Sequence, residues 1–400
     1  MPRNRIIYQS EAVYAGPSPA TGYHILTGAI AEPWPSFSAG GSNVSRVKQL
    51  QRIQTANYSF NIARQDVNQF GELAAIDRVI LESPTVSLDT SYILGSLENE
   101  SLLGFSLTPS GSTATFAALS GILNKTEDER NYFIKTVPEG SDALGDSDVL
   151  NPSTTVNTNV IGIGNGFISS YTTEASVGDF PTASVSVEAL NMAFSKGVSG
   201  NFIPAVTPTD GSKITDIYYA LPSGESSNNV SGVSALRPGD ITLSFYPNGS
   251  TTEMGGFTGV SITDAKIQSY SLSFDLARDP LQKLGSRFAF AREITFPVTV
   301  TCTVDANLGD LYTGNLADVI DADSAYDINL KLNAPGTAGA AAAAASDNVM
   351  ARYVLKRCKI DSQEYTSDIG SNKAVSLTFS AQIGGPAQTD VGLFISGLAH

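Results

Sequence analysis

Residue types that could carry out chemistry are scarce in this chain of 400 residues. It has two histidines, His24 and His400, far apart in the sequence, and no candidate base stands near a serine or cysteine nucleophile. The segment Gly162–Gly166 reads GIGNG, with glycines at alternate positions, which is typical of a strand edge or a bulge and not of a dinucleotide-binding loop. We therefore predict a protein that is not an enzyme, with no catalytic residue and no cofactor.

One segment has the outline of a cation-binding loop. Asp66–Gly71 reads DVNQFG, like the start of a calcium loop, but Phe70 replaces an oxygen donor and the bidentate Glu at the end of such a loop is missing. We predict no metal site there.

The arginines Arg64 and Arg278 are the polar residues of most interest, because each holds the same place in a repeated sequence. Residues 53–71 read IQTANYSFNIARQDVNQFG and residues 267–285 read IQSYSLSFDLARDPLQKLG, with identities at one constant offset. Each arginine follows a strand pattern and precedes a turn. Two interpretations stand: a surface ion pair with a nearby Asp, or a bridge to a neighbouring domain or subunit, where Arg is favoured for its bidentate pairing.

The repeated segments predict half-buried strands followed by turns. Phe60 and Ile62 alternate with polar residues, as do Leu272, Phe274 and Leu276 in the second copy, so apolar side chains share one face. The glycine that closes each copy suits a turn. Return strands are expected at Ile80–Leu88 and Arg292–Val304, which gives two extended hairpins, Tyr58–Leu88 and Leu272–Val304.

A second match indicates that whole domains are duplicated. Residues 168–187 align with 360–379, in the same order as the first match but at a shorter offset. We expect domain 1 at 1–196, a linker at 197–213 and domain 2 at 214–400. Each domain would carry one flanking helix, at Ser112–Lys125 and near Leu311–Ile320, and the strands Tyr132–Val137 and Tyr326–Leu332 would correspond.

Composition and charge restrict the class of protein. The hydrophobic fraction is 42%, and 36 Gly and 19 Pro suit short strands joined by turns, so we predict an all-β fold with minor α content. The net charge of −15 disfavours a sequence-specific nucleic-acid binder. The two cysteines, Cys302 and Cys358, are expected to be reduced core residues. No secretory leader or long apolar run is present, which predicts assembly in the cytoplasm and no membrane partner.

The sequence resembles the tail tube proteins of tailed bacteriophages. Residues 271–302 (SLSFDLARDPLQKLGSRFAFAREITFPVTVTC) look like the first half of that fold, and residues 166–188 (GFISSYTTEASVGDFPTASVSVE) look like its second half. Residues 14–23 (YAGPSPATGY) resemble openings in the same family. Together these stretches cover about half of the chain, and none is a catalytic signature.

The resemblance implies two tandem β-sandwich or barrel domains, each with a flanking helix and a long hairpin, in a structural virion protein whose rings stack into the tail tube and form the channel for DNA ejection. The hairpins would be the inter-subunit and inter-ring arms, which makes these residues the contact candidates: Arg64, Gln69, Phe70, Gly71, Arg278, Leu284, Gly285 and Arg292. Two domains per chain predict homotrimeric, pseudo-hexameric rings, with a ring of twelve domains as the alternative.

Partners follow from the same resemblance. They are further copies of the chain, the tape-measure protein and genomic DNA held without sequence specificity in the lumen, and the tail sheath, baseplate and terminator proteins. Some of the 39 Asp and Glu residues are expected to face the lumen. Alternatives are another ring-forming tail component, such as a distal tail, terminator or baseplate protein, and a β-rich adhesin.

Overall fold

The computed structural model describes the chain in stretches. These are residues 11–17, 44–45, 47–81, 83–109, 117–124, 128–137, 139, 143, 159–196, 204–207, 211–212, 218–219, 235–247, 266–285, 288–289, 291–307, 325–334, 349–366, 374–388 and 390–397. Both histidines, the second expected helix at 311–320, and almost all of the loops at 139–158 and 334–347 lie outside these stretches.

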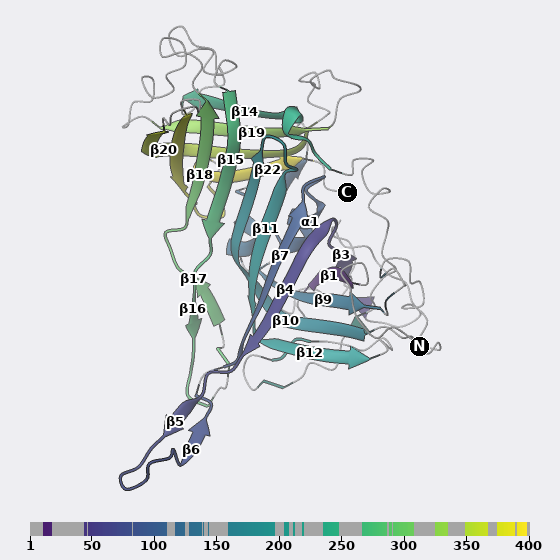
Figure 1. Cartoon of the computed structure of the whole chain (residues 1–400), viewed down its shortest axis with the longest axis vertical. Helices are drawn as coiled ribbons and strands as arrows, with labels where there is room; N and C mark the ends of the chain where they lie inside the picture. The colour runs from purple at the N-terminus through teal and green to yellow at the C-terminus, as the bar shows by residue number, and fades with distance from the viewer. Residues whose placement is uncertain are drawn as a thin grey trace.

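The described residues are mostly strands (Figure 1). In the first half these are β1 (Glu11–Pro17), β2 (Val44–Ser45), β3 (Lys48–Gln49), β4 (Ile53–Asn61), β5 (Gln65–Val67), β6 (Asp77–Val79), β7 (Thr85–Ile93), β8 (Leu107–Pro109), β9 (Glu129–Thr136), β10 (Asn159–Ser176), β11 (Thr182–Ala189) and β12 (Asn191–Lys196). In the second half they are β13 (Tyr218–Tyr219), β14 (Ile241–Pro247), β15 (Lys266–Asp275), β16 (Arg278–Leu281), β17 (Ala291–Ile294), β18 (Thr299–Asn307), β19 (Tyr326–Asn333), β20 (Val349–Thr366), β21 (Ala374–Gln382) and β22 (Gly392–Gly397).

Helical structure is minor. It consists of α1 (Glu98–Leu103), α2 (Ser120–Leu123) and one 3-10 turn at Pro238–Asp240. The all-β class with minor α content is therefore confirmed, although within the described residues no sheet closes into a barrel.

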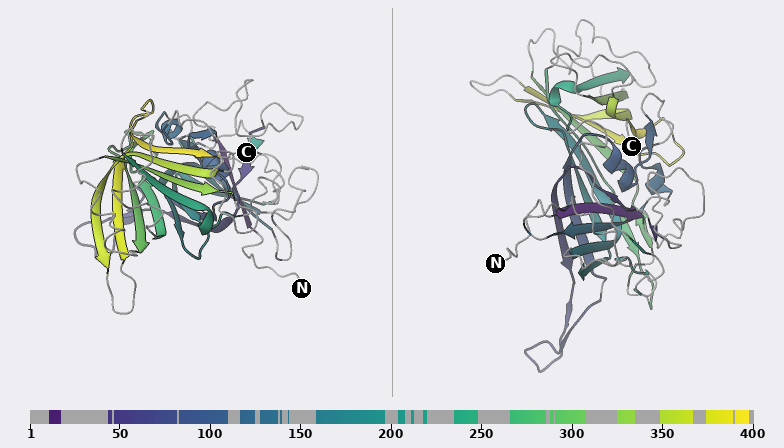
Figure 2. Two further views of the ribbon diagram at one scale, coloured as in Figure 1. Left: turned by 90° about the horizontal axis from the view of Figure 1, so that it is seen from above. Right: turned by 90° about the vertical axis from the view of Figure 1, so that its right-hand side faces the viewer.

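One sheet runs through both halves of the chain, in the order β4-β7-β11-β10-β15-β18-β21-β20, and we call it the long sheet. Its strands follow an arc when the molecule is seen from above (Figure 2, left). Strands β10 and β20 have 18 residues each, and only the later part of each lies in the long sheet. Their earlier parts pair with β9 and β12, and with β19 and β22, so each half has a second layer of strands.

The two halves repeat not only strands but also strand register. At the offset that separates Ile53 from Ile267, the β4–β7 ladder becomes the β15–β18 ladder, and the bulge after Ile53 recurs after Ile267. The bulge after Ile168 recurs after Ile360 in the same way. Register is set by which face must be buried, so a shared register shows that the two copies bury equivalent faces. The domain bounds themselves remain a prediction.

The GIGNG segment lies within β10 at a break in the ladder with β9, as its glycine spacing predicted. A side chain at Gly164 would collide with the backbone of Pro204, so only glycine allows this close approach. The Asn165 side chain donates to the Val206 carbonyl and accepts from the Val206 amide. This part of the predicted linker is therefore packed against β10.

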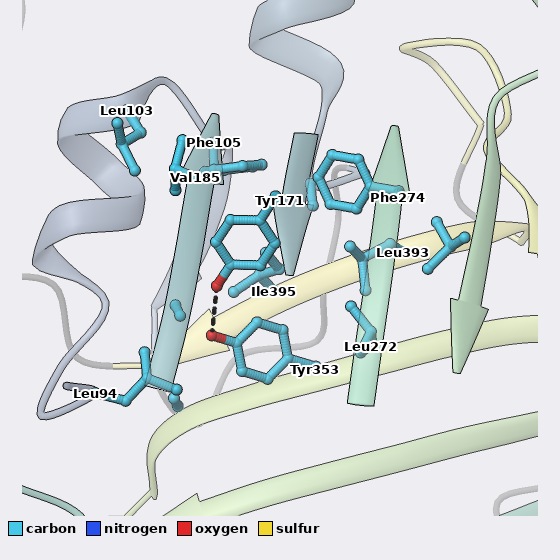
Figure 3. Packing of buried hydrophobic residues seen from close by; sticks show 14 of the residues in the cluster. Leu94, Leu103, Phe105, Tyr171, Val185, Leu272, Phe274, Tyr353, Leu393 and Ile395 are labelled. Carbon is cyan, nitrogen blue, oxygen red and sulfur yellow. Dashed lines mark hydrogen bonds between the residues drawn. The ribbon is translucent and has the colours of Figure 1, made fainter. Parts of the chain in front are cut away.

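One large hydrophobic core extends through both halves, and two smaller buried clusters lie apart from it. Tyr171 of β10 stacks on Phe274 of β15 with ring centroids 5.6 Å apart, and Phe105 packs edge-on against both rings (Figure 3). Both cysteines are buried and free, as predicted.

Two expected elements differ from the structure. Within Ser112–Lys125 the structure describes residues 117–124, and only Ser120–Leu123 is helical, because Ala117 to Leu119 form a turn that docks on Leu393. The return strands are β7 and β18, which begin after Pro84 and Pro297 instead of running from Ile80 and Arg292. Proline lacks the amide that a ladder needs, so each predicted strand is interrupted and the hairpin arm is separated from the sheet.

Candidate functional site: a filled junction and two open edges

The two halves meet edge to edge in the long sheet, at the pairing of β10 with β15. Seven antiparallel pairs run from Ser170↔Asp275 to Ser176↔Ser269. Beyond the ladder, the Leu276 amide donates to the Ser169 carbonyl at 2.7 Å. We call this pairing the in-chain junction, and it joins two copies of the same unit by backbone hydrogen bonds.

A cluster of five side chains, which we call the arginine clamp, closes one end of the in-chain junction. Arg278 donates two hydrogen bonds to the carboxylate of Asp128, at 3.0 and 2.5 Å, and one to the Ile168 carbonyl at 3.4 Å. Arg292 pairs with Glu188 at 2.5 Å. Both guanidinium groups lie over the ring of Phe167, at 5.0 and 5.8 Å from its centroid.

The two arginines and Asp128 of the clamp are largely removed from water. The side chain of Arg278 is 2% exposed, that of Asp128 8% and that of Arg292 6%, whereas that of Glu188 is 43% exposed. Charges buried this far are retained only when they are paired and hydrogen-bonded. Loss of one partner of the Arg278–Asp128 pair would leave a buried charge uncompensated, so separation of the two halves at this point is costly.

The long sheet ends in two strand edges that have no further strand among the described residues: β4 at one end and the later part of β20 at the other. They are the copies of the two strands that meet at the in-chain junction. Phe60 of β4 is 43% exposed, whereas its equivalent Phe274 is 2% exposed. Tyr365 of β20 is 46% exposed, whereas its equivalent Thr173 is fully buried. An open edge that carries exposed aromatic rings is a template for pairing with another chain.

One face of the long sheet packs on the core, and the other is lined by hydroxyl and carboxylate groups. We call the second one the polar face. Between the bulges of the strands it consists almost entirely of Ser, Thr, Asn, Asp and Glu: Thr55, Asn57, Ser59 and Asn61 on β4; Ser87, Asp89 and Ser91 on β7; Thr182, Ser184, Ser186 and Glu188 on β11; Ser170, Thr172, Glu174 and Ser176 on β10; Ser269, Ser271, Ser273 and Asp275 on β15; Thr299, Thr301, Thr303, Asp305 and Asn307 on β18; Ser376, Thr378 and Ser380 on β21; Ser362, Glu364 and Thr366 on β20. None of these residues is buried.

The charged residues in this list are all acidic, although Arg292 of the clamp reaches Glu188. Lys266 and Lys359 lie beyond the bulges at opposite ends of the face, opposite Asn307 and Ser380. Neighbouring hydroxyls bond across strands, as between Ser59 and Ser87 at 2.7 Å. Between its ends, a face of this kind offers hydrogen bonds to water but no cation to a phosphate.

Two hairpins project from the same end of the long sheet, β5 with β6 and β16 with β17 (Figure 1). Their tips carry large apolar side chains in full contact with solvent, with Phe70 108% and Leu284 103% exposed. Gly71 and Gly285 occupy the turns with φ of 95° and 85°, a backbone conformation that favours glycine. The calcium-like segment 66–71 is thus one side of a hairpin and its tip.

A buried carboxyl group links the two halves on the core side. Glu100 of α1 accepts hydrogen bonds from the hydroxyls of Tyr92 at 2.8 Å and Tyr171 at 3.1 Å. The Tyr171 hydroxyl in turn lies 3.0 Å from that of Tyr353 in the second half (Figure 3). Removal from water raises the pKa of Glu100 to about 7, against the opposing effect of the tyrosine hydroxyls and Arg52.

The structure separates the sequence-predicted contact residues into groups. Arg278 and Arg292 come together in the arginine clamp, while Arg64 is exposed near the β4 edge. Gln69, Phe70 and Gly71 lie at one hairpin tip, and Leu284 and Gly285 lie at the other.

Sequence reasoning did not identify the other members of the clamp, Asp128, Phe167 and Glu188. Nothing local marked them, because they reach the arginines only through the pairing of β10 with β15. The repeat did hold one clue, since the offset that relates Arg64 to Arg278 also relates Arg78 to Arg292.

The described residues contain neither a metal-binding cluster nor a membrane-spanning helix. No cluster of three or more His, Cys, Asp or Glu side chains there could hold a metal ion. None of the helices there is long and apolar enough to cross a membrane.

Comparison with known proteins leaves the family open. No family model matches the sequence, and no curated protein matches it. Among solved structures, a chain of "Cryo-EM structure of the anti-feeding prophage (AFP) baseplate, 6-fold symmetrised" is similar at 8% identity, with a TM-score of 0.24. The match covers 39% of this chain and 92% of that chain. A likeness at this level carries no argument about function.

Proposed function

We propose that this protein is a structural subunit of a phage tail, and specifically the tail tube subunit, which closes into rings around a channel and stacks into a tube. The observation that carries the proposal is the in-chain junction. The chain already contains one complete contact between two copies of a unit, and it leaves the two halves of the same contact open at β4 and β20.

The in-chain junction supplies the register expected between chains. Moving each pair by the two offsets of the repeat turns Thr172↔Ser273 into Glu364 of one copy opposite Ser59 of the next. The same operation turns Tyr171↔Phe274 into Gln363 opposite Phe60. These residues lie at opposite ends of one long sheet, so a chain cannot satisfy them by itself.

Head-to-tail contacts between identical subunits either close into a ring or continue as a filament. Each chain contributes eight strands in an arc, so three chains would close a barrel of about 24 strands, wider than the barrels of 16 to 18 strands that already leave an aqueous channel. With strands about 4.8 Å apart and tilted by about 40°, such a barrel measures roughly 45 to 50 Å across its backbone.

The polar face suits the lumen of such a ring. Apolar side chains of the long sheet face the second layer, which leaves the hydroxyl and carboxylate groups to line the channel. Non-specific affinity for DNA depends on Lys and Arg contacts to phosphate, which the polar face lacks between its ends. DNA would therefore pass along this wall without being retained.

The remaining partners belong to the same proposal. The tape-measure protein and genomic DNA would occupy the lumen, and tail sheath, baseplate and terminator proteins would contact the outside and the ends of the tube. The assembled protein would be part of the virion. The hairpin tips, with exposed Phe70 and Leu284, would serve as arms that contact the next subunit or the next ring.

Electron microscopy of the purified protein, raised in concentration, tests the proposal. We expect hollow rings and stacked cylinders, with a mass for the smallest closed species of three chains of 41.9 kDa. Rings that never stack would favour a terminator or distal tail protein instead. A protein that stays monomeric at every concentration and salt would contradict ring formation altogether.

A further inference from the structure

The in-chain junction and the open edges are equivalent in backbone but not in side chains. On the β4 side the repeat keeps both arginines of the clamp, since Arg64 corresponds to Arg278 and Arg78 to Arg292. On the β20 side the repeat keeps neither Phe167 nor Glu188, the clamp residues that β10 and β11 contribute.

The two replaced positions are clear from the strand registers. Phe167 and Glu188 face each other between β10 and β11, and the offset that separates Ile168 from Ile360 turns this pair into Lys359 and Ser380, which face each other between β20 and β21. An aromatic ring and a carboxylate are thus exchanged for a cation and a hydroxyl. The third acceptor, Asp128, corresponds to Ser324 when β9 and β19 are aligned, and that residue lies outside the described stretches.

This inference rests on the proposed ring. We propose that the contact between copies is a weakened form of the in-chain junction, in which Lys359 and Ser380 lower the affinity of the β20 edge for the β4 edge of a second copy. The chain then keeps its own two halves joined permanently, while the equivalent contact between chains forms reversibly, above a threshold concentration.

The charges at the contact between copies explain the lower affinity. Pairing in the expected register brings Lys359 to the place of Phe167, next to Arg64 and Arg78. Like charges at close range disfavour association, and salt screens that repulsion. Arg78 is already engaged within its own hairpin, by Asp66 at 2.6 Å.

Two other acids near this contact do not restore the clamp. Asp361 occupies the bulge position of Ser169, outside the two positions that hold the ring and the carboxylate of the clamp. Glu364 corresponds to Thr172, which lies further along the polar face. At the two clamp positions themselves, the β20 side therefore presents a cation and a hydroxyl in place of a ring and a carboxylate.

A variant that rebuilds the clamp tests the inference. Lys359→Phe with Ser380→Glu restores the ring and the carboxylate on the β20 side. The concentration at which rings appear should fall by about ten-fold or more, because a charge-assisted hydrogen bond is gained and a like-charge contact is removed at every contact between copies. The control is Thr378→Glu, which adds the same charge on the same strand and face but opposite Ser362 and Thr303. It should not lower the threshold.

Salt gives a second readout. Raising salt from about 0.05 to 0.5 M spans Debye lengths from above 10 Å to near 4 Å, and it should promote assembly of the wild-type protein but not of the rebuilt variant. If the wild type assembles and the rebuilt variant shows the same threshold as the wild type or as Thr378→Glu, this inference is overturned and the proposed ring stands. If neither protein assembles, both this inference and the proposed ring are contradicted.

Discussion

Arg278→Ala removes one partner of a buried ion pair. Arg64→Ala removes the arginine at the equivalent place in the repeat, where the side chain is exposed. Arg278 is 2% exposed at its side chain and is held by Asp128, by the Ile168 carbonyl and by the ring of Phe167. The two substitutions thus share chemistry and local sequence and differ only in what the fold places around them.

The structure sets the expected magnitudes. Removal of one partner of a buried pair leaves an uncompensated charge, here that of Asp128, and costs about 3 to 5 kcal/mol of the free energy of unfolding. Arg64→Ala removes an exposed side chain and should change that free energy by no more than about 0.5 kcal/mol in the monomer.

Urea unfolding followed by circular dichroism, at protein concentrations below the assembly threshold, measures both variants. The double variant Arg278→Ala with Asp128→Ala should recover part of the loss, because no unpaired charge then remains. Equal urea midpoints for Arg278→Ala and Arg64→Ala would refute the reasoning, since the clamp would then contribute nothing to the in-chain junction.

Three further outcomes are expected. The native pKa of Glu100 is raised to about 7 from 4.5, so its stabilising contribution is complete below pH 4.5 and is lost as pH rises through 7, a loss of roughly 3 kcal/mol. Urea midpoints measured across pH 4 to 8 should show this loss in the wild type, and Glu100→Gln should abolish it. If the dependence of the midpoint on pH is the same in Glu100→Gln, the loss belongs to another group. Phe60→Lys should block assembly and leave the urea midpoint of the monomer unchanged, whereas Phe274→Lys should destabilise the monomer itself; assembly by Phe60→Lys at the wild-type threshold would exclude β4 from the contact. Asp89→Lys with Glu174→Lys should make assembled tubes retain DNA at low salt in a filter-binding assay and slow genome ejection, and tubes that still release DNA freely would place the polar face elsewhere than in the lumen.

The strands were predictable where their physical cause is local. Alternation of Phe60 and Ile62 with polar residues identified β4, and the repeat identified β15. The turn glycines Gly71 and Gly285 lie at hairpin tips, as their conformational freedom suggested. Prolines near the starts of β7 and β18 explain why the return strands begin later than predicted.

Contacts between residues that are far apart in the chain could not be predicted from the sequence. Arg64 and Arg278 have nearly the same neighbours in sequence, yet one is exposed and the other is buried, because only the second is covered by β10 from the other half. The short helix α1 was missed for a related reason. Glu98 and Glu100 are buried there, and Glu100 is bonded to tyrosines that lie elsewhere in the sequence, so no amphipathic pattern marks the segment.

The most direct test of the central claim, that the β20 edge of one copy pairs with the β4 edge of the next in the register of the in-chain junction, is cysteine crosslinking. Residues directly opposite in an antiparallel pair are about 5 Å apart, within reach of a disulfide, while a shift of two residues increases the separation to about 7 to 8 Å. Under oxidation, Ser59→Cys with Glu364→Cys should give disulfide-linked dimers and trimers on a non-reducing gel, and Ser59→Cys with Thr366→Cys should not. Equal crosslinking of the two variants, or monomers only from an assembled Ser59→Cys, Glu364→Cys protein, would contradict the account.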